Sequence, residues 1–195
     1  PGVVGARVMG VVPTSFEEIW RMGNMLSQTK MVPEAFQGKP NDCTAALMYG
    51  LELGLSPMAA MQSIAVINGK PSLYGDGMIA VVRSSGLLEW IKETDDGSTA
   101  TCVLKRRGEP DAITRTFSQE EAKRAQLAAK TGPWTQYPQR MRAMRARSWA
   151  LRDTFADVLR GIASAEEMLD VHEMKDVTPV SARPPAIMDE LPDIP

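Results

Sequence analysis

The sequence has few of the residues on which most catalytic and metal centres depend. It contains one histidine, His172, and two cysteines, Cys43 and Cys102. A zinc site of histidine and cysteine therefore lacks ligands, and His172, surrounded by acids, is typical of a solvated helix end. A lone cysteine pair is not the disulfide framework of a small secreted domain, so we expect both thiols to be reduced. No serine or cysteine has a suitable histidine base, which excludes catalysis by a nucleophile that histidine activates.

Long apolar segments and nucleotide-binding loops are also missing. The longest apolar runs, 64–67 and 78–82, are far shorter than the roughly 18 residues that a membrane span requires. The first dozen residues lack the pattern of a secretory leader, so we expect a cytoplasmic protein without membrane contact. The phosphate-binding loop of ATPases has a glycine five residues before its Gly-Lys pair. In this sequence Ile64 stands at that position before Gly69-Lys70, which argues against ATP-driven activity. We expect no cofactor and no metal.

The formal net charge of −2 hides a strong segregation of charge along the chain. Residues 121–152 contain eight basic residues and one acid, whereas residues 166–195 contain eight acids and two basic residues. Such a distribution creates a local positive field that the total charge conceals. We therefore expect the basic segment to meet a polyanion.

The pattern of caps, turns and apolar spacing predicts an α+β fold. Helices are expected at 15–28, 44–53 with Asp42 as cap, 77–84, from Ser118 to about 129, and at 137–160. Asn68-Gly69 predicts a tight β-hairpin of residues 64–67 and 70–74. Three antiparallel strands are expected at 88–94, 99–106 and 112–117. The prediction is a small antiparallel sheet with a hairpin, packed against several helices of which one is long and arginine-rich.

Three regions are expected along the chain. Residues 1–14 are predicted to be a flexible leader and residues 15–173 a single domain that contains the basic segment. Residues 174–195 contain several prolines among many acids, which predicts a disordered tail that either solubilises the protein or competes with the polyanion for the basic segment.

The helix expected at 137–160 carries the main functional hypothesis. A helical wheel places Met141, Met144, Leu151, Phe155 and Leu159 on a core-facing stripe, with the arginines on its flanks. A guanidinium group can bond two phosphate oxygens at once, and aromatic rings at positions 134 and 137 could stack on bases. The alternative is a solvated amphipathic helix whose arginines pair with acids. The scarcity of acids along the helix favours the first hypothesis, in which the arginines bind an external polyanion. The candidates here are Trp134, Tyr137, Arg140, Arg142, Arg145, Arg147 and Arg152.

Weaker basic candidates lie elsewhere in the chain. Lys105, Arg106 and Arg107 end a predicted strand, where charges also simply keep a hairpin soluble. Lys70 and Arg83 are similar cases. A magnesium nuclease that uses Glu121 and Lys123 stays an alternative, although Glu121 is explained by helix capping. A sequence-specific regulator of duplex DNA and a purely structural oligomer also stay open.

Four blocks of the sequence, within residues 42–168, resemble the RecT family of phage recombinases. They are Gly50-Leu51-Glu52-Leu53-Gly54-Leu55-Ser56-Pro57, Ile67-Asn68-Gly69-Lys70-Pro71, Phe117-Ser118 with Glu121-Ala122-Lys123-Arg124-Ala125, and Gly132-Pro133-Trp134 continuing to Leu151-Arg152. The resemblance implies an ATP-independent protein of a bacterial host cell that anneals single-stranded DNA as a homo-oligomeric ring or filament. It also implies a phage exonuclease and the host single-strand-binding protein as partners. Trp134, Tyr137, Arg140, Arg145 and Arg147 stand in the matching block as DNA-side or core-positioning residues.

Overall fold

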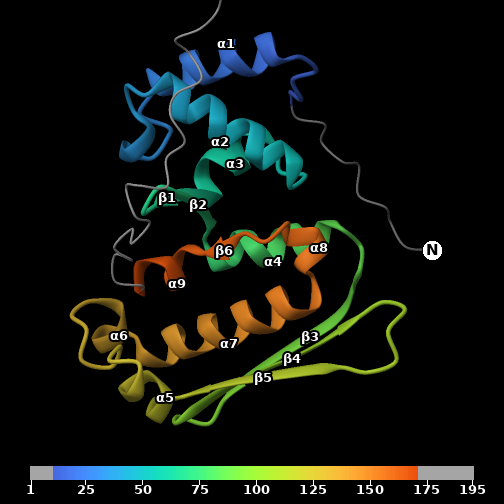
Figure 1. Ribbon diagram of the computed structural model, residues 1–195, viewed down its shortest axis with the longest axis vertical. Helices are drawn as coiled ribbons and strands as arrows, with labels where there is room; N and C mark the ends of the chain where they lie inside the picture. Colours follow the sequence, from blue (N-terminus) through green and yellow to red (C-terminus); the bar gives the residue numbers. More distant parts are fainter. Residues whose placement is uncertain (1–10, 171–195) are drawn as a thin grey trace, which may run out of the picture.

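The computed structural model describes residues 11–170, so the expected tail at 174–195 and His172 lie outside the described residues. Figure 1 shows three regions: a cluster of helices at one end, a sheet at the other, and the helix α7 (Pro138–Thr154) beside that sheet. The predicted α+β class is confirmed. Among the described residues, no helix is long and apolar enough to cross a membrane.

The first region contains α1 (Phe16–Ser27), η1 (Glu34–Phe36), α2 (Pro40–Glu52) and α3 (Pro57–Ser63). Ser15 caps α1 as predicted, accepting a hydrogen bond from the Glu18 amide at 3.2 Å. Asp42 is not the cap of α2, because that helix begins at Pro40 and places Asp42 in its first turn. Gly54 (φ +74°) follows the end of α2 as expected.

A small sheet follows these helices. The hairpin of β1 (Ile64–Ile67) and β2 (Lys70–Leu73) has positive φ at both Asn68 and Gly69, as a tight primed turn requires. Unlike the prediction, β2 also pairs in parallel with β6 (Ala163–Ser164). Next to this sheet, α4 (Gly75–Ser84) buries its apolar face.

The second sheet is the predicted antiparallel meander of β3 (Leu88–Asp95), β4 (Thr99–Arg106) and β5 (Ile113–Ser118). The predicted capping box of Ser118 and Glu121 is present and starts α5 (Gln119–Arg124). That helix ends about five residues before the predicted limit, with Gln126 at a φ of +59°.

The long predicted helix at 137–160 is interrupted. The short helix α6 (Pro133–Gln136) precedes α7, and α8 (Ala156–Leu159) follows it after a break at Phe155 (φ −124°, ψ 36°). Phe155 is fully buried, and Arg160 ends α8 in the left-handed conformation. The chain then forms β6 and α9 (Ala165–Asp170), which returns against α7. Burial of Phe155 accompanies a turn that helical periodicity alone does not predict.

Candidate nucleic-acid interface

Helix α7, which was expected to present arginines to solvent, is the central helix of this half of the molecule. It contacts the three strands of the β3–β4–β5 sheet as well as α4, β6 and α9. From Met141 to Leu151 every residue is buried or half-buried. The expected core residues Leu151, Phe155 and Leu159 are fully buried. The contacts on several sides of α7 explain why burial is not confined to one stripe.

Arg142 lies inside this packing and not on an exposed flank. Its side chain is 3% exposed, and its Nη2 donates to Asp95 Oδ1 at 3.1 Å and to the Gly97 carbonyl at 2.9 Å. Both acceptors belong to the turn region between β3 and β4. Arg142 therefore ties α7 to the end of the sheet.

Arg140 and Arg147, which the helical wheel placed on one flank, share a partner on α4. Arg140 Nη2 lies 3.3 Å from Asp76 Oδ2, and Arg147 Nη1 donates to Asp76 Oδ1 at 3.1 Å. Arg147 also forms two 2.8 Å bonds to Glu93 of β3, which raise the pKa of its guanidinium above the ordinary value. The two residues differ in exposure, because the Arg140 side chain is 57% exposed and that of Arg147 only 12%.

Arg145 and Arg152 point instead to α9. Arg145 Nη2 donates to Asp170 at 2.5 Å and Arg152 Nη1 donates to Glu167 at 2.5 Å. Trp134 is 4% exposed, and its Nε1 also donates to Asp170 at 3.0 Å. The guanidinium of Arg145 lies 5.6 Å from the Phe117 ring centroid and 6.0 Å from that of Trp134. This arrangement holds α9 against α7.

The interpretation that these arginines lack protein partners is wrong. The scarcity of acids along α7 itself is real, but the partners come from α4, β3 and α9 in the folded chain. Trp134, buried and hydrogen-bonded, is not an exposed stacking surface. Trp134, Arg142, Arg145 and Arg147 thus contact protein groups that position α7.

The amino end of α7 is the part of the predicted site that remains open to solvent. Tyr137, the residue that directly precedes α7, is 66% exposed, and Arg140 stands three residues later in the first turn of the helix. The acid partner of Arg140, Asp76, is itself 71% exposed. An ion pair between two exposed side chains is weak and is readily exchanged for another anion. Arg152 is 42% exposed, but it bonds to Glu167, which is only 8% exposed.

The other candidates are dispersed. Arg106 binds Asp157 through two 2.6 Å bonds, which lower the pKa of Asp157 to about 2, and it covers the Phe155 ring. Lys105 lies 3.8 Å from Glu89. Lys70, Arg83 and Arg107 are exposed and form no ion pair within residues 11–170. Lys70 belongs to the first hairpin and Arg83 to α4, and Arg107 directly follows β4.

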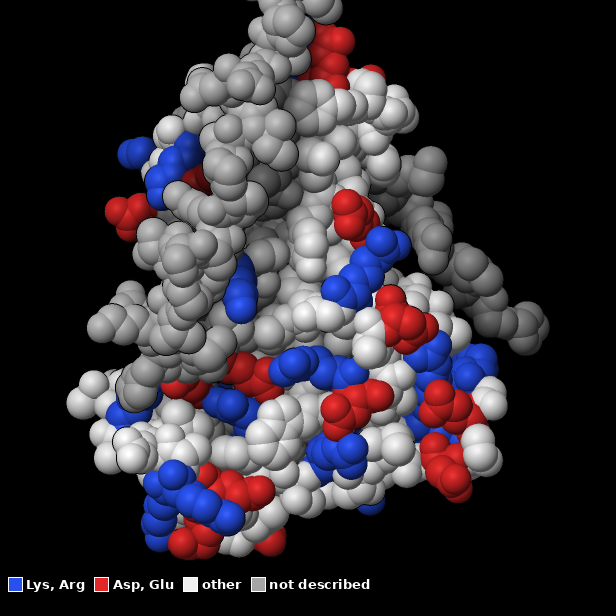
Figure 2. Space-filling view, in the orientation of Figure 1, with Lys and Arg blue, Asp and Glu red and all other residues white. Residues whose placement is uncertain are grey.

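Basic and acidic groups alternate on the face shown in Figure 2 and do not gather into one positive patch there. In the described part of the chain, no group of three or more acidic, histidine or cysteine side chains is placed to hold a metal ion.

A model of the RecT family matches residues 61–180, which is more than half of the chain and includes α4, the β3–β4–β5 sheet and α7. The chain belongs to the RecT family. The RecT match makes it a recombination and DNA-annealing protein. A comparison with curated proteins gave no match. The predicted block from Gly132 to Arg152 lies wholly inside the RecT match.

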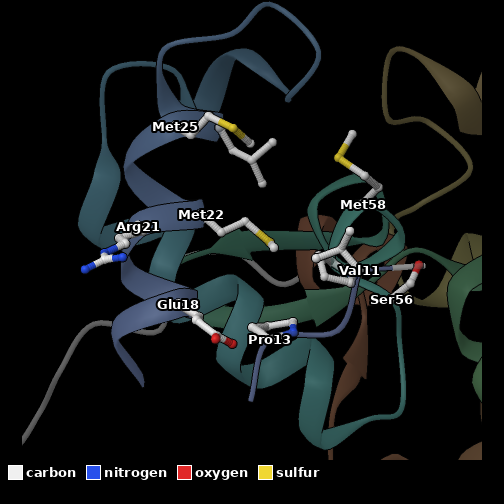
Figure 3. Close-up of a pocket in the computed structure, with 10 residues that line it drawn as sticks. Val11, Pro13, Glu18, Arg21, Met22, Met25, Ser56 and Met58 are labelled. Carbon is white, nitrogen blue, oxygen red and sulfur yellow. The ribbon is translucent and has the colours of Figure 1, made fainter. Parts of the chain in front are cut away.

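One further surface of this RecT protein is a hollow of about 700 Å³ between α1 and α3. Figure 3 shows Met22 of α1 and Met58 of α3 pointing toward this hollow, with Val11 and Pro13 at its edge, while Arg21 points away. Met25 and Met58 are 58% and 42% exposed. Flexible methionine side chains on an apolar surface are typical of protein contacts.

Proposed function

We propose that this RecT-family chain binds and anneals single-stranded DNA without ATP, through the exposed amino end of α7. The observation that carries the proposal is the exposure of both Tyr137 and Arg140, which stand three residues apart at the start of α7. A ring beside a guanidinium group is the combination with which proteins hold single strands, by stacking on bases and by contact with phosphates. Arg140 exchanges Asp76 for a phosphate at little cost, because the exposed pair is weak.

The remaining candidates have different parts in this proposal. Lys70, Arg83 and Arg107, which are exposed, would add phosphate contacts along a bound strand. Arg152 would do so after release of Glu167. The buried Trp134 and Arg142 and the half-buried Arg145 and Arg147 would act as positioning residues that keep α7 in place.

Binding of this kind explains how annealing proceeds without a reacting group. Arginine and lysine neutralise phosphates, so that two strands approach with less repulsion. Contacts to the backbone carry no sequence information, which leaves base edges free to test complementarity. The energy then comes from base pairing and from release of counterions. In this proposal the protein is not an enzyme, and its partners on DNA are an exonuclease that exposes the strand and a single-strand-binding protein.

We also infer that the protein acts as a homo-oligomer, in a ring or a filament. The apolar hollow lined by Met22, Met25 and Met58 supports this inference, since a neighbouring subunit would bury these exposed side chains. Substitution of Met25 by glutamate places a charge in the hollow and should shift the light-scattering mass toward smaller species. An unchanged mass would show that the hollow is not a contact between subunits.

Affinity for oligo(dT) at several salt concentrations tests the DNA site. Arg140→Gln should bind about tenfold more weakly, equivalent to one charge-assisted hydrogen bond of about 1.5 kcal/mol. Its slope of log affinity against log salt should fall by about one phosphate contact. The matched control is Arg160→Gln, because Arg160 is 58% exposed and forms a similar exposed pair with Glu52. Equal affinities and salt slopes for both variants would contradict the assignment.

A further inference from the structure

The β3–β4–β5 sheet has one covered face and one open face. Ala100, Cys102 and Leu104 alternate along β4 and are at most 1% exposed, on the side packed by α7. The residues between them project to the other side, because strand side chains alternate. Figure 1 shows the sheet at the edge of the molecule, with α7 along one side. The register assigns the following residues to the open face: Trp90, Lys92, Thr94, Thr101, Val103, Lys105, Thr114 and Thr116.

The alternation of side chains along β3 also places acidic and basic residues on opposite faces of the sheet. Glu93 and Asp95 point to the covered side, where they pair with Arg147 and Arg142. Lys92 directly precedes Glu93 in the sequence, so its side chain projects to the other face, and it is exposed. Glu93 and Asp95 are thus neutralised on the covered face, and Lys92 remains on the open face.

An exposed indole lies next to this positive charge. Trp90 is 41% exposed and stands directly opposite Lys105 in the register. Among the described acids, Glu89 approaches this face from the β-bulge, but its carboxylate is 3.8 Å from Lys105 Nζ and 40% exposed. A pair with that separation and exposure leaves the lysine accessible to other anions.

We propose that the open face of the β3–β4–β5 sheet is a second binding surface for single-stranded DNA. The Trp90 indole stacks on a base, and Lys92 and Lys105 contact the neighbouring phosphates. The threonine hydroxyls of β4 and β5 supply hydrogen bonds along the same face. This inference rests on the proposed function and adds a surface to it, because Arg140 lies on the side of α7 that faces Asp76 of α4.

The positive charge of the open face favours DNA over a second copy of the chain as its partner. An apolar partner surface would bury the ammonium group of Lys92, which forms no ion pair within residues 11–170, and would enclose the loose Lys105–Glu89 pair, and both are unfavourable. A single strand brings one phosphate per nucleotide and a flat base for the indole. Two such surfaces on one subunit bring two strands to the same protein molecule, as annealing requires.

The test measures oligo(dT) affinity for the full chain and its variants by fluorescence anisotropy, with circular dichroism as a check of folding. Trp90→Ala should weaken binding about five- to 150-fold, the range for loss of one stacked base. Trp90→Phe should restore most of the affinity, because phenylalanine keeps an aromatic face. The control is Trp20→Ala, since Trp20 is a 47% exposed indole on α1, far along the chain from the sheet.

The outcomes separate this inference from the proposed function. If the wild-type protein binds oligo(dT) and the Trp90→Ala and Trp20→Ala variants bind it with equal affinity, the proposed sheet surface is wrong and the proposed α7 site is unaffected. A smaller assembly for Trp90→Ala, with unchanged DNA affinity per subunit, would assign the face to a second copy and overturn the inference too. A wild-type protein that binds no single strand would overturn both proposals.

Discussion

Replacement of Arg142 by alanine should destabilise the fold far more than replacement of Arg140, although the two residues are neighbours on one helix. Arg142 is 3% exposed and donates to Asp95 and Gly97, whereas Arg140 is 57% exposed and pairs with the exposed Asp76. Breaking a buried ion pair costs about 3–5 kcal/mol, because a charge remains without a partner. The Asp95 side chain is 17% exposed, so water reaches it, and we expect the lower end, about 3 kcal/mol. Loss of the exposed pair should cost under about 1 kcal/mol.

Urea denaturation measures this difference. With an m value of about 2 kcal/mol per molar, Arg142→Ala should lower the midpoint by about 1.5 M and Arg140→Ala by less than about 0.5 M. Protein concentration must be fixed, since association adds to apparent stability. A cycle with Asp95→Ala should give a coupling energy above about 1 kcal/mol. Equal midpoints for the two arginine variants, or no coupling to Asp95, would refute the division between positioning and exposed arginines.

Three further outcomes follow from the packing and the ionisable groups. Gly50→Ala should lower stability by about 1–3 kcal/mol in thermal or urea unfolding, because its Cβ would lie 2.2 Å from that of Ala60 on the neighbouring helix, and wild-type stability would contradict this packing. Burial raises the pKa of Cys102 to about 12, so at pH 8 a thiol reagent should modify it only after denaturant is added, and rapid labelling of the native protein would disagree. The hydrogen bonds from Arg106 lower the pKa of Asp157 to about 2, so their stabilisation is present above the unfolded value near 4 and is lost as pH falls through about 2. Asp157→Asn should therefore be less stable than wild type at pH 7 and nearly equal to it at pH 2, and an equal loss at both values would exclude the carboxylate charge as the cause.

Local sequence signals predicted most elements of the fold. Turn and cap residues act over a few positions, which is why Asn68-Gly69, Gly54 and the Ser118 capping box are found where they were expected. The break at Phe155 and the pairing of β6 with β2 depend on packing between distant segments. Such contacts have no local pattern that a single sequence displays.

The candidate site was predicted in part, for a similar reason. The position of the arginine-rich helix and the shared flank of Arg140 and Arg147 could be derived from periodicity, and both reach Asp76. The depth of burial could not, because it depends on what packs around α7. One signal was present: Ile91, Glu93 and Asp95 alternate along a strand, which places two acids on the same side as a core residue. That alternation points to internal partners for arginine.

Annealing of two complementary oligonucleotides in nucleotide-free buffer tests the central claim most directly. The proposal predicts that the wild-type protein accelerates annealing with both strands intact, that Arg160→Gln matches it, and that the double variant Tyr137→Ala, Arg140→Gln loses most of the acceleration while remaining folded. No acceleration by the wild-type protein, degradation of the strands on addition of magnesium, or full activity of the double variant would contradict it.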